Sequence, residues 1–269
     1  MRPQLLAVTS SLLRSTTARL YPSSPLAPLS GLILGHQSLA VKAQPQYQAQ
    51  QQVLYTSQTA ANMSATPINA NSVLDLIKNR RTYYPLSKDL PISKERISEI
   101  VKEAVLHVPS SFNAQSNRVI VLLGADHEKL WDIATDILKA IVPAEAFQAT
   151  ADKMGMFKGA AGTVLFFEDE KTVQKQQSDY PMYADKFPGW ATQSDAMLQF
   201  VVWTALEAEG AIGANLQHYN PLINERVAAE WNVPSDWKLN AQLVFGGKTG
   251  EAGPKSQIPV EERVKVFGA

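Results

Sequence analysis

The segment 192–209 places the strongest constraint on how this chain can fold. It is long enough for several helical turns and contains neither glycine nor proline. Apolar side chains occupy both of its sides, with Met197, Phe200, Val201 and Ala205 on one and Leu198, Val202, Trp203 and Leu206 on the other. A helix of this kind must be covered on two sides. We therefore expect a central helix or a helix that bridges two subunits.

Periodic segments surround this helix. Apolar residues at helical spacing predict further helices at residues 68–80, 93–108, 130–141 and 221–231. In the second of them, Ser93 is the expected N-cap, and the apolar face consists of Ile97, Ile100, Val101, Ala104, Val105 and Val108. Apolar runs predict buried strands at residues 118–123, 162–167, 211–216 and 241–245. This mixture of helices and strands indicates an α+β or α/β fold.

Charge divides the chain into two regions. The first 74 residues contain 4 basic and 0 acidic side chains, and the remainder contains 21 basic and 25 acidic ones. Residues 1–66 are also rich in Ser, Thr, Ala, Gln and Pro, which predicts a disordered leader that combines a mitochondrial transit peptide with a linker. An unselected disordered tail is the alternative. The folded domain is then 67–269, and a second translation start at Met63 would leave it in the cytoplasm.

Composition argues against several classes of function. The chain has no cysteine, which excludes disulfides, thiolate nucleophiles and cysteine-ligated metals. The mildly acidic body has no stripe of Lys and Arg, so nucleic-acid binding is not expected. The histidines lack metal-ligand spacing, and no apolar run approaches the roughly 20 residues that span a bilayer. A redox function would therefore need a bound organic cofactor.

Two polar segments are candidates for ligand binding. Arg80 and Arg81 leave the first predicted helix and precede Thr82, Tyr83 and Tyr84. Paired guanidiniums bind phosphate oxygens well, although such a pair is also a common solvated helix end. The second segment, 109–115, reads Pro-Ser-Ser-Phe-Asn-Ala-Gln. Its amides could bind a planar heterocycle, or its residues could serve only as turn formers.

Together the two segments resemble the N-terminal signatures of the FMN-dependent nitroreductase family, and the Arg-Arg-Thr-Tyr-Tyr variant is most similar to its fungal nitroreductase-like branch. Later landmarks follow in the order typical of that family: the strand at 162–167, Glu209-Gly210, the stretch 213–218 and Gly246-Gly247-Lys248. The resemblance covers roughly residues 67–269. It implies an α+β nitroreductase-like fold, with a central, mixed, mostly antiparallel sheet flanked by helices, in an intertwined homodimer.

The resemblance also implies which residues bind FMN. Arg80 and Lys255 would hold the phosphate, residues of the 109–115 segment would reach the flavin of the other subunit, and the backbone at Gln217 and His218 would lie near flavin N5. His218 could instead be an ordinary core-facing histidine. The complete implied set is Arg80, Arg81, Thr82, Tyr84, Pro109, Ser110, Ser111, Asn113, Gln115, Gln217, His218 and Lys255.

No catalytic side chain is implied, because flavin N5 itself carries the hydride. The resemblance implies an oxidoreductase that uses NADH or NADPH. It would reduce nitroaromatics, quinones or similar small electrophiles by a ping-pong mechanism, in the response to oxidative stress or xenobiotics. One alternative is a flavin-binding redox or lipid-signalling regulator with little turnover. A second alternative is a helical interaction protein without flavin.

Tyr84 is a departure from the family pattern and motivates the regulator alternative. Well-studied bacterial members carry a lysine at about this place, and tyrosine cannot neutralise a reduced flavin. Arg81, Lys153 and Lys158 are the candidates for a replacement cation. Aromatic residues at 180–188 could form a lid, whereas Trp190, Trp203, Trp231 and Trp237 are interpreted as core residues.

Overall fold

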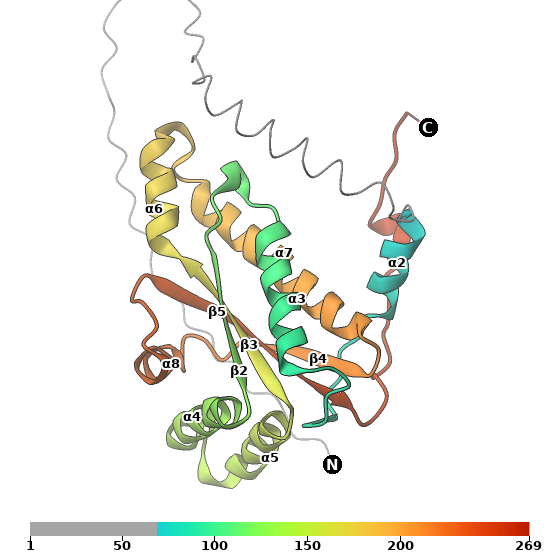
Figure 1. Cartoon of the computed structure of the whole chain (residues 1–269), viewed down its shortest axis with the longest axis vertical. Helices are drawn as coiled ribbons and strands as arrows, with labels where there is room; N and C mark the ends of the chain where they lie inside the picture. Colours follow the sequence, from blue (N-terminus) through green and yellow to red (C-terminus); the bar gives the residue numbers. More distant parts are fainter. Residues whose placement is uncertain (1–68, 269) are drawn as a thin grey trace, which may run out of the picture. The chain divides into compact units, whose positions relative to one another are not determined.

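The structure, a computed structural model, describes residues 69–268 (Figure 1). The predicted leader at 1–66 and the second start at Met63 lie outside the described residues. Within the described part, no helix has the combination of length and apolar character that crossing a membrane requires.

A five-stranded sheet forms the centre of the domain. Its strands are β1 (Leu86–Ser87), β2 (Asn117–Leu123), β3 (Gly162–Asp169), β4 (Ile212–Gln217) and β5 (Trp237–Lys248). They run in the order β1-β5-β3-β2, and β4 also pairs with β5. All pairings between these strands are antiparallel, and one isolated parallel bridge joins Thr82 to Ala214. The expected mostly antiparallel sheet and the α+β class are confirmed.

Helices cover both faces of this sheet (Figure 1). They are α2 (Ala70–Asn79), α3 (Lys94–His107), α4 (Ala125–Ile141), α5 (Phe147–Lys158), α6 (Glu170–Asp179), α7 (Phe187–Ala208) and α8 (Asn224–Trp231). Strand β3 is buried along its whole length, because apolar side chains on each of its faces meet a layer of helices. This explains why its central residues, 164–167, form a continuous apolar run rather than an alternating one.

Helices α3 and α7 pack on one face of the sheet. Ile97, Ile100, Val101 and Ala104 of α3 join Leu198, Val202 and Leu206 of α7 in one core cluster. Ser93 caps α3 as expected, because its side chain accepts a hydrogen bond from the Arg96 backbone N–H at 3.2 Å. Val105, assigned to the apolar face from the sequence, is instead exposed.

Helices α4, α5 and α8 form the core on the other face. Within this core, His127 is 1% exposed and lies between two oxygen atoms. Its Nε2 is 3.1 Å from the Phe157 carbonyl oxygen, which can only accept, and its Nδ1 is 2.9 Å from the Thr163 hydroxyl. Neutral imidazole therefore satisfies both contacts, and burial lowers the pKa of His127 to about 4.

Two helices were missed in the sequence, and several boundaries shifted. In α5 only Met154 and Phe157 are buried, and in α6 only Val173 is, so neither helix produces a clear apolar period. The segment 180–188, expected as a loop, contains a short 3-10 turn and the first residues of α7. Strand β5 is longer than the predicted 241–245 because it includes polar and glycine residues, Asn240 and Gly246 among them.

We expect His127 to make the fold less stable in acid. Because its folded pKa of about 4 lies below the ordinary value of 6.5, the unfolded chain binds more protons as the pH falls below 6.5, and stability is lost. Between pH 7 and pH 5, the free energy of unfolding measured in urea should fall by roughly 2 kcal/mol more for the wild type than for His127→Gln. Equal losses in the two proteins would contradict this account, since other titrating groups are common to both.

Candidate functional site

The arginine segment lies along the edge of strand β4. The Tyr83 backbone N–H donates to the Ala214 carbonyl at 3.0 Å, and the Asn215 side-chain amide donates to the Tyr83 carbonyl at 2.8 Å. A Cβ atom at Gly213 would lie 2.8 Å from the Cβ of Tyr83, so only glycine permits this close approach. The structure thus brings Arg80, Arg81 and Thr82 beside the predicted 213–218 stretch.

A buried carboxylate at the end of α7 holds this segment. Glu207 is 8% exposed, and its Oε2 accepts a hydrogen bond from the Arg81 backbone N–H at 3.0 Å. Its Oε1 accepts one from the indole N–H of Trp203 at 2.7 Å. Burial raises the pKa of Glu207, and these two hydrogen bonds together with Lys248 and Arg80 oppose that shift.

The Arg80 side chain lies over the ring of Trp203. The central carbon of its guanidinium is 4.4 Å from the ring centroid, a cation–π contact. The Nε of Arg80 is buried and has no hydrogen-bond partner. A buried donor without a partner loses the stabilisation of a hydrogen bond, so this atom is suited to an oxygen of a bound ligand.

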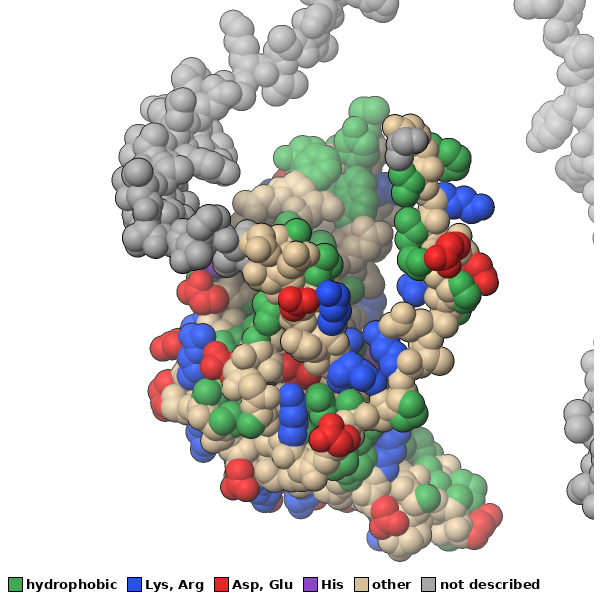
Figure 2. Space-filling view, turned by 90° about the vertical axis from the view of Figure 1, so that its right-hand side faces the viewer, with side chains coloured by type: hydrophobic (Ala, Val, Ile, Leu, Met, Phe, Trp, Pro, Cys, Tyr) green, Lys and Arg blue, Asp and Glu red, His purple; other side chains and the backbone are tan. Residues whose placement is uncertain are grey.

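Further cations lie close to the arginine pair. The Lys248 ammonium is 4.5 Å from the Tyr83 ring centroid and donates to the Gly210 carbonyl at 2.9 Å. The Arg81 guanidinium donates to the carbonyl of Gly253, which brings the C-terminal segment that contains the exposed Lys255 to this corner. On the face where α2 lies, Lys and Arg side chains gather near the middle (Figure 2). The corner can therefore attract an anion.

The second polar segment is a strained turn after α3. Phe112, Asn113 and Gln115 have positive φ angles of 54°, 52° and 53°, a region that non-glycine residues seldom occupy. The Gln115 backbone N–H donates to the Ser110 hydroxyl at 2.9 Å, so part of this segment acts as a turn former, as the sequence allowed. The Ser194 hydroxyl of α7 donates to the Pro109 carbonyl at 2.9 Å.

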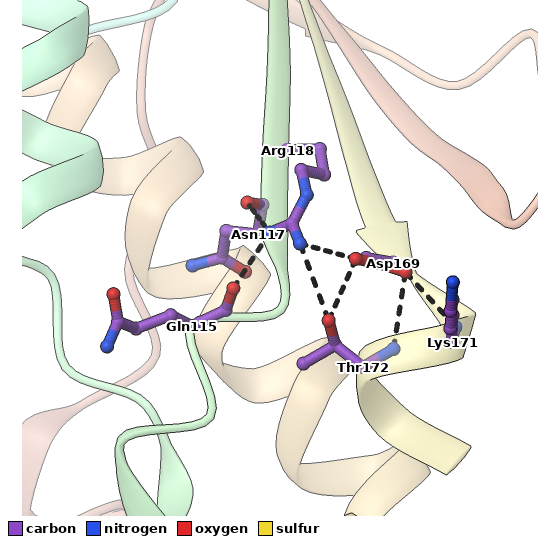
Figure 3. Close-up of polar contacts among 6 residues, drawn as sticks. All are labelled: Gln115, Asn117, Arg118, Asp169, Lys171 and Thr172. Atoms are coloured by element: carbon purple, nitrogen blue, oxygen red, sulfur yellow. Dashed lines mark hydrogen bonds and ion pairs between the residues drawn. The ribbon is translucent and has the colours of Figure 1, made fainter. Parts of the chain in front are cut away.

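Arg118 fixes the far end of this turn (Figure 3). Its guanidinium donates to the carbonyls of Gln115 and Asn117 at 2.8 and 2.9 Å. The same group pairs with Asp169, the N-cap of α6, and lies 3.4 Å from the hydroxyl oxygen of Thr172. One side chain therefore ties the turn to the end of β3 and the start of α6.

Aromatic side chains from the predicted lid segment pack against the turn. Phe112 is half-exposed, and its ring centroid lies 4.6 Å from that of Tyr180, 5.5 Å from Phe187 and 5.9 Å from Trp190. The residues at 180–188 thus contact the turn directly. Since Tyr180 and Tyr183 also remain partly exposed, these rings offer an aromatic surface to a planar molecule.

The two polar segments are attached to α7 at well-separated points. Pro109 is bonded to Ser194, and Arg81 is bonded to Glu207, thirteen positions further along the same helix. At 1.5 Å per residue, these anchors are roughly 20 Å apart. Within one chain the structure therefore does not combine all the predicted residues into one compact site.

The remaining predicted residues have mixed outcomes. The Gln217 side chain is buried and donates to the Asn215 side-chain oxygen at 2.8 Å. His218 is exposed, so the alternative of a core-facing histidine is wrong. Lys158 is paired with Asp132 at 2.7 Å, and Lys153 lies on the same helix, α5, which packs on the sheet face opposite α7.

Sequence reasoning missed three residues of the arginine corner. Trp203 packs against the core as the sequence predicts, but it is only half-buried and also carries Arg80 on its ring, which the sequence does not show. Glu207 and Lys248 received no role. The available signal was the spacing of Trp203 and Glu207, since side chains four residues apart on a helix lie next to each other.

Comparison with known proteins gives a consistent picture. Residues 77–247 match the model of the nitroreductase family. Nitroreductase FRM2 of Saccharomyces cerevisiae is 33% identical over 196 residues, which cover 72% of this chain and 96% of FRM2. Nitroreductase CinD from Lactococcus lactis, solved in complex with nicotinic acid, is 45% identical with a TM-score of 0.68 and covers 73% of this chain and 100% of CinD.

A more distant structure shares the fold. A nitroreductase from Desulfitobacterium hafniense, solved with bound FMN, is 17% identical and has a TM-score of 0.54. The match covers 75% of this chain and 100% of that protein. CinD has also been solved with chloramphenicol and with 4-nitrophenol.

We expect Arg118→Met to destabilise the domain. The substitution removes all the guanidinium hydrogen bonds and leaves the mostly buried Asp169 carboxylate without its cation. The free energy of unfolding should therefore fall by about 2 to 3 kcal/mol. Arg226→Met is the matched control, because Arg226 forms only an exposed ion pair with Asp136 at 3.4 Å, worth about 0.5 kcal/mol or less. Similar losses in urea unfolding of the two variants would refute the anchoring role.

Proposed function

Because the chain belongs to the nitroreductase family, we propose that it is an FMN-dependent oxidoreductase. It takes hydride from NADH or NADPH and passes it to small electrophiles such as nitroaromatics or quinones. The observation that carries this proposal is the arginine corner, where Arg80 is held over Trp203 with a buried, unpartnered Nε.

The residues of the corner fit the phosphate of FMN. Arg80 has a buried donor free for an anionic oxygen, and the Arg81 guanidinium and the Lys248 ammonium lie around the same corner. Charge-assisted hydrogen bonds to phosphate are among the strongest in proteins. Lys255 follows Gly253 by two residues and would add a further cation, in the role that the family resemblance gives it.

At the other end of the cofactor, the ring would lie near the end of β4. The Gln217 side chain donates to Asn215, and in the role that the family resemblance gives them, the backbone groups at 217 and 218 would lie near flavin N5. FMN supplies hydride chemistry at N5 when bound. The protein needs only to hold the ring, leave one face open and place positive charge near it.

The proposed active form is a homodimer. The turn at 109–115 and the arginine corner are anchored roughly 20 Å apart on α7, and a second subunit could bring a turn to each corner. The outer side of α7 leaves Met197, Phe200 and Val201 about 40% exposed, although the sequence indicates a helix that is covered on both sides. Helix α2 likewise has no buried residue and exposes Val73, Leu74, Leu76 and Ile77.

The choice of acceptor rests on chemistry and on the relatives. The rings of Phe112, Tyr180 and Tyr183 offer flat, partly exposed surfaces, which suit planar electron-poor molecules through stacking. The solved complexes of CinD contain 4-nitrophenol and chloramphenicol. Small aromatic electrophiles are accordingly the acceptors to test first.

Purified full-length protein should bind FMN and show a flavin absorbance spectrum. Under anaerobic conditions NADH or NADPH should bleach the flavin band, and 4-nitrophenol should restore it, because the reduced cofactor then has an acceptor. A flavin that neither nucleotide reduces would favour the regulator instead. A colourless protein that takes up no added FMN would overturn the flavoprotein assignment altogether.

We expect Phe200→Glu to break the dimer. A carboxylate in the middle of the apolar α7 surface would have to be desolvated on association, at a cost of several kcal/mol. Sedimentation should show a dimer for the wild type and a monomer for the variant. Glu99→Gln on the exposed side of α3 is the control and should remain dimeric, and a wild type that sediments as a monomer would exclude the shared site.

A further inference from the structure

We propose that Glu207 is a positioning residue, which sets the geometry of Arg80 and Arg81 for the phosphate of the cofactor. This role rests on the proposed function, and it adds a residue to the site that the sequence motifs did not include. Glu207 would not touch the cofactor in this role. It acts through the backbone of one arginine and through the indole beneath the other.

The first connection is to the backbone between the two arginines. Glu207 Oε2 accepts the Arg81 N–H at 3.0 Å across 126 positions of sequence. Arg80 has extended backbone angles as the C-cap of α2, so the chain changes direction at this point. The hydrogen bond that the first peptide N–H after that cap donates to Glu207 of α7 fixes the direction in which the chain leaves α2.

The second connection runs through Trp203. Glu207 Oε1 accepts the indole N–H at 2.7 Å, which holds the ring in one orientation. The Arg80 guanidinium lies 4.4 Å from the centroid of the same ring. One carboxylate thus determines both where the Arg80 backbone leaves the helix and which surface its side chain rests on.

A carboxylate suits this position better than any neutral side chain. Its two oxygens each accept one N–H, whereas a glutamine would offer one acceptor and turn its NH₂ group toward a donor. Burying a carboxylate costs free energy that an apolar residue would not. The cost is consistent with a role in holding the arginines in one arrangement, since a preorganised site loses less conformational entropy when it binds.

The direct test compares two flavins that differ only in the phosphate. Full-length wild type, Glu207→Gln and Trp203→Phe are titrated with FMN and with riboflavin, and flavin fluorescence quenching gives each Kd. Glu207→Gln should weaken FMN about tenfold, the loss expected from one misplaced charge-assisted contact, while riboflavin binding stays within about twofold. Trp203→Phe should lose part of the same FMN preference, because it keeps an aromatic ring at this position but removes the indole N–H that Glu207 accepts.

Two control variants show whether the effect is specific to the phosphate contact and to Glu207. Arg80→Ala should remove most of the preference for FMN, because it deletes the phosphate contact itself. Glu209→Gln makes the same substitution at the same helix end, but Glu209 pairs with Arg96 and not with residues of the arginine corner. This variant should bind both flavins as the wild type does. Unfolding temperatures of all variants are recorded without flavin.

The outcomes separate this inference from the proposed function. If the wild type binds neither flavin, the flavoprotein proposal fails and the role of Glu207 fails with it. If the wild type prefers FMN and Glu207→Gln keeps or increases that preference, the positioning role alone is wrong. An equal loss of both flavins in Glu207→Gln, or a variant too unstable to titrate combined with an unchanged preference in Trp203→Phe, also overturns it.

Discussion

Helix α7 is the element on which the candidate site depends, because each polar segment is hydrogen-bonded to a buried side chain of this helix. Ser194 holds the carbonyl of Pro109, and Glu207 holds the amide of Arg81. The inner side of the same helix supplies Leu198, Val202 and Leu206 to the core. The core therefore fixes α7, and α7 in turn fixes two loops that have little apolar surface of their own.

Such an arrangement requires polar groups inside an apolar helix, and each of them needs partners. Asp195 is 1% exposed, and burial raises its pKa to about 6. Its Oδ2 accepts hydrogen bonds from Gln199 at 2.7 Å and from Asn240 at 3.1 Å, and Asn240 also donates to the buried Glu168 at 2.7 Å. Asp195 is thus tied directly to β5 and, through Asn240, to Glu168 of β3, which helps to keep the helix in register on the sheet.

The features that depend on local sequence patterns, such as buried helix faces and helix caps, were mostly predicted correctly from the sequence. The burial of Ile97, Leu198 and β3 and the cap at Ser93 all follow from local patterns. Helix α6 could not be found in this way, because an almost wholly polar segment has no period to detect. The pairing of Glu207 with Arg81 also escaped prediction, because a contact across 126 positions depends on how the sheet brings α7 and the arginine segment together. The order of the sequence motifs identified Arg80 and Arg81 as candidate site residues. Only the fold showed that Glu207 and Trp203 hold them in place.

The exposed apolar residues on the outer side of α7 indicate how two subunits would form a complete site. Most homodimers have two-fold symmetry, so a surface patch of one subunit contacts the same patch of the other. If Met197, Phe200 and Val201 form that patch, two α7 helices related by a two-fold axis across them run in opposite directions. The Ser194 half of one helix then approaches the Glu207 end of its partner. An antiparallel pair would thereby remove the separation of roughly 20 Å between the two anchors within one chain. The same exposed apolar surface that a monomer cannot satisfy would then bring the turn and the arginine corner together, once at each end of the helix pair.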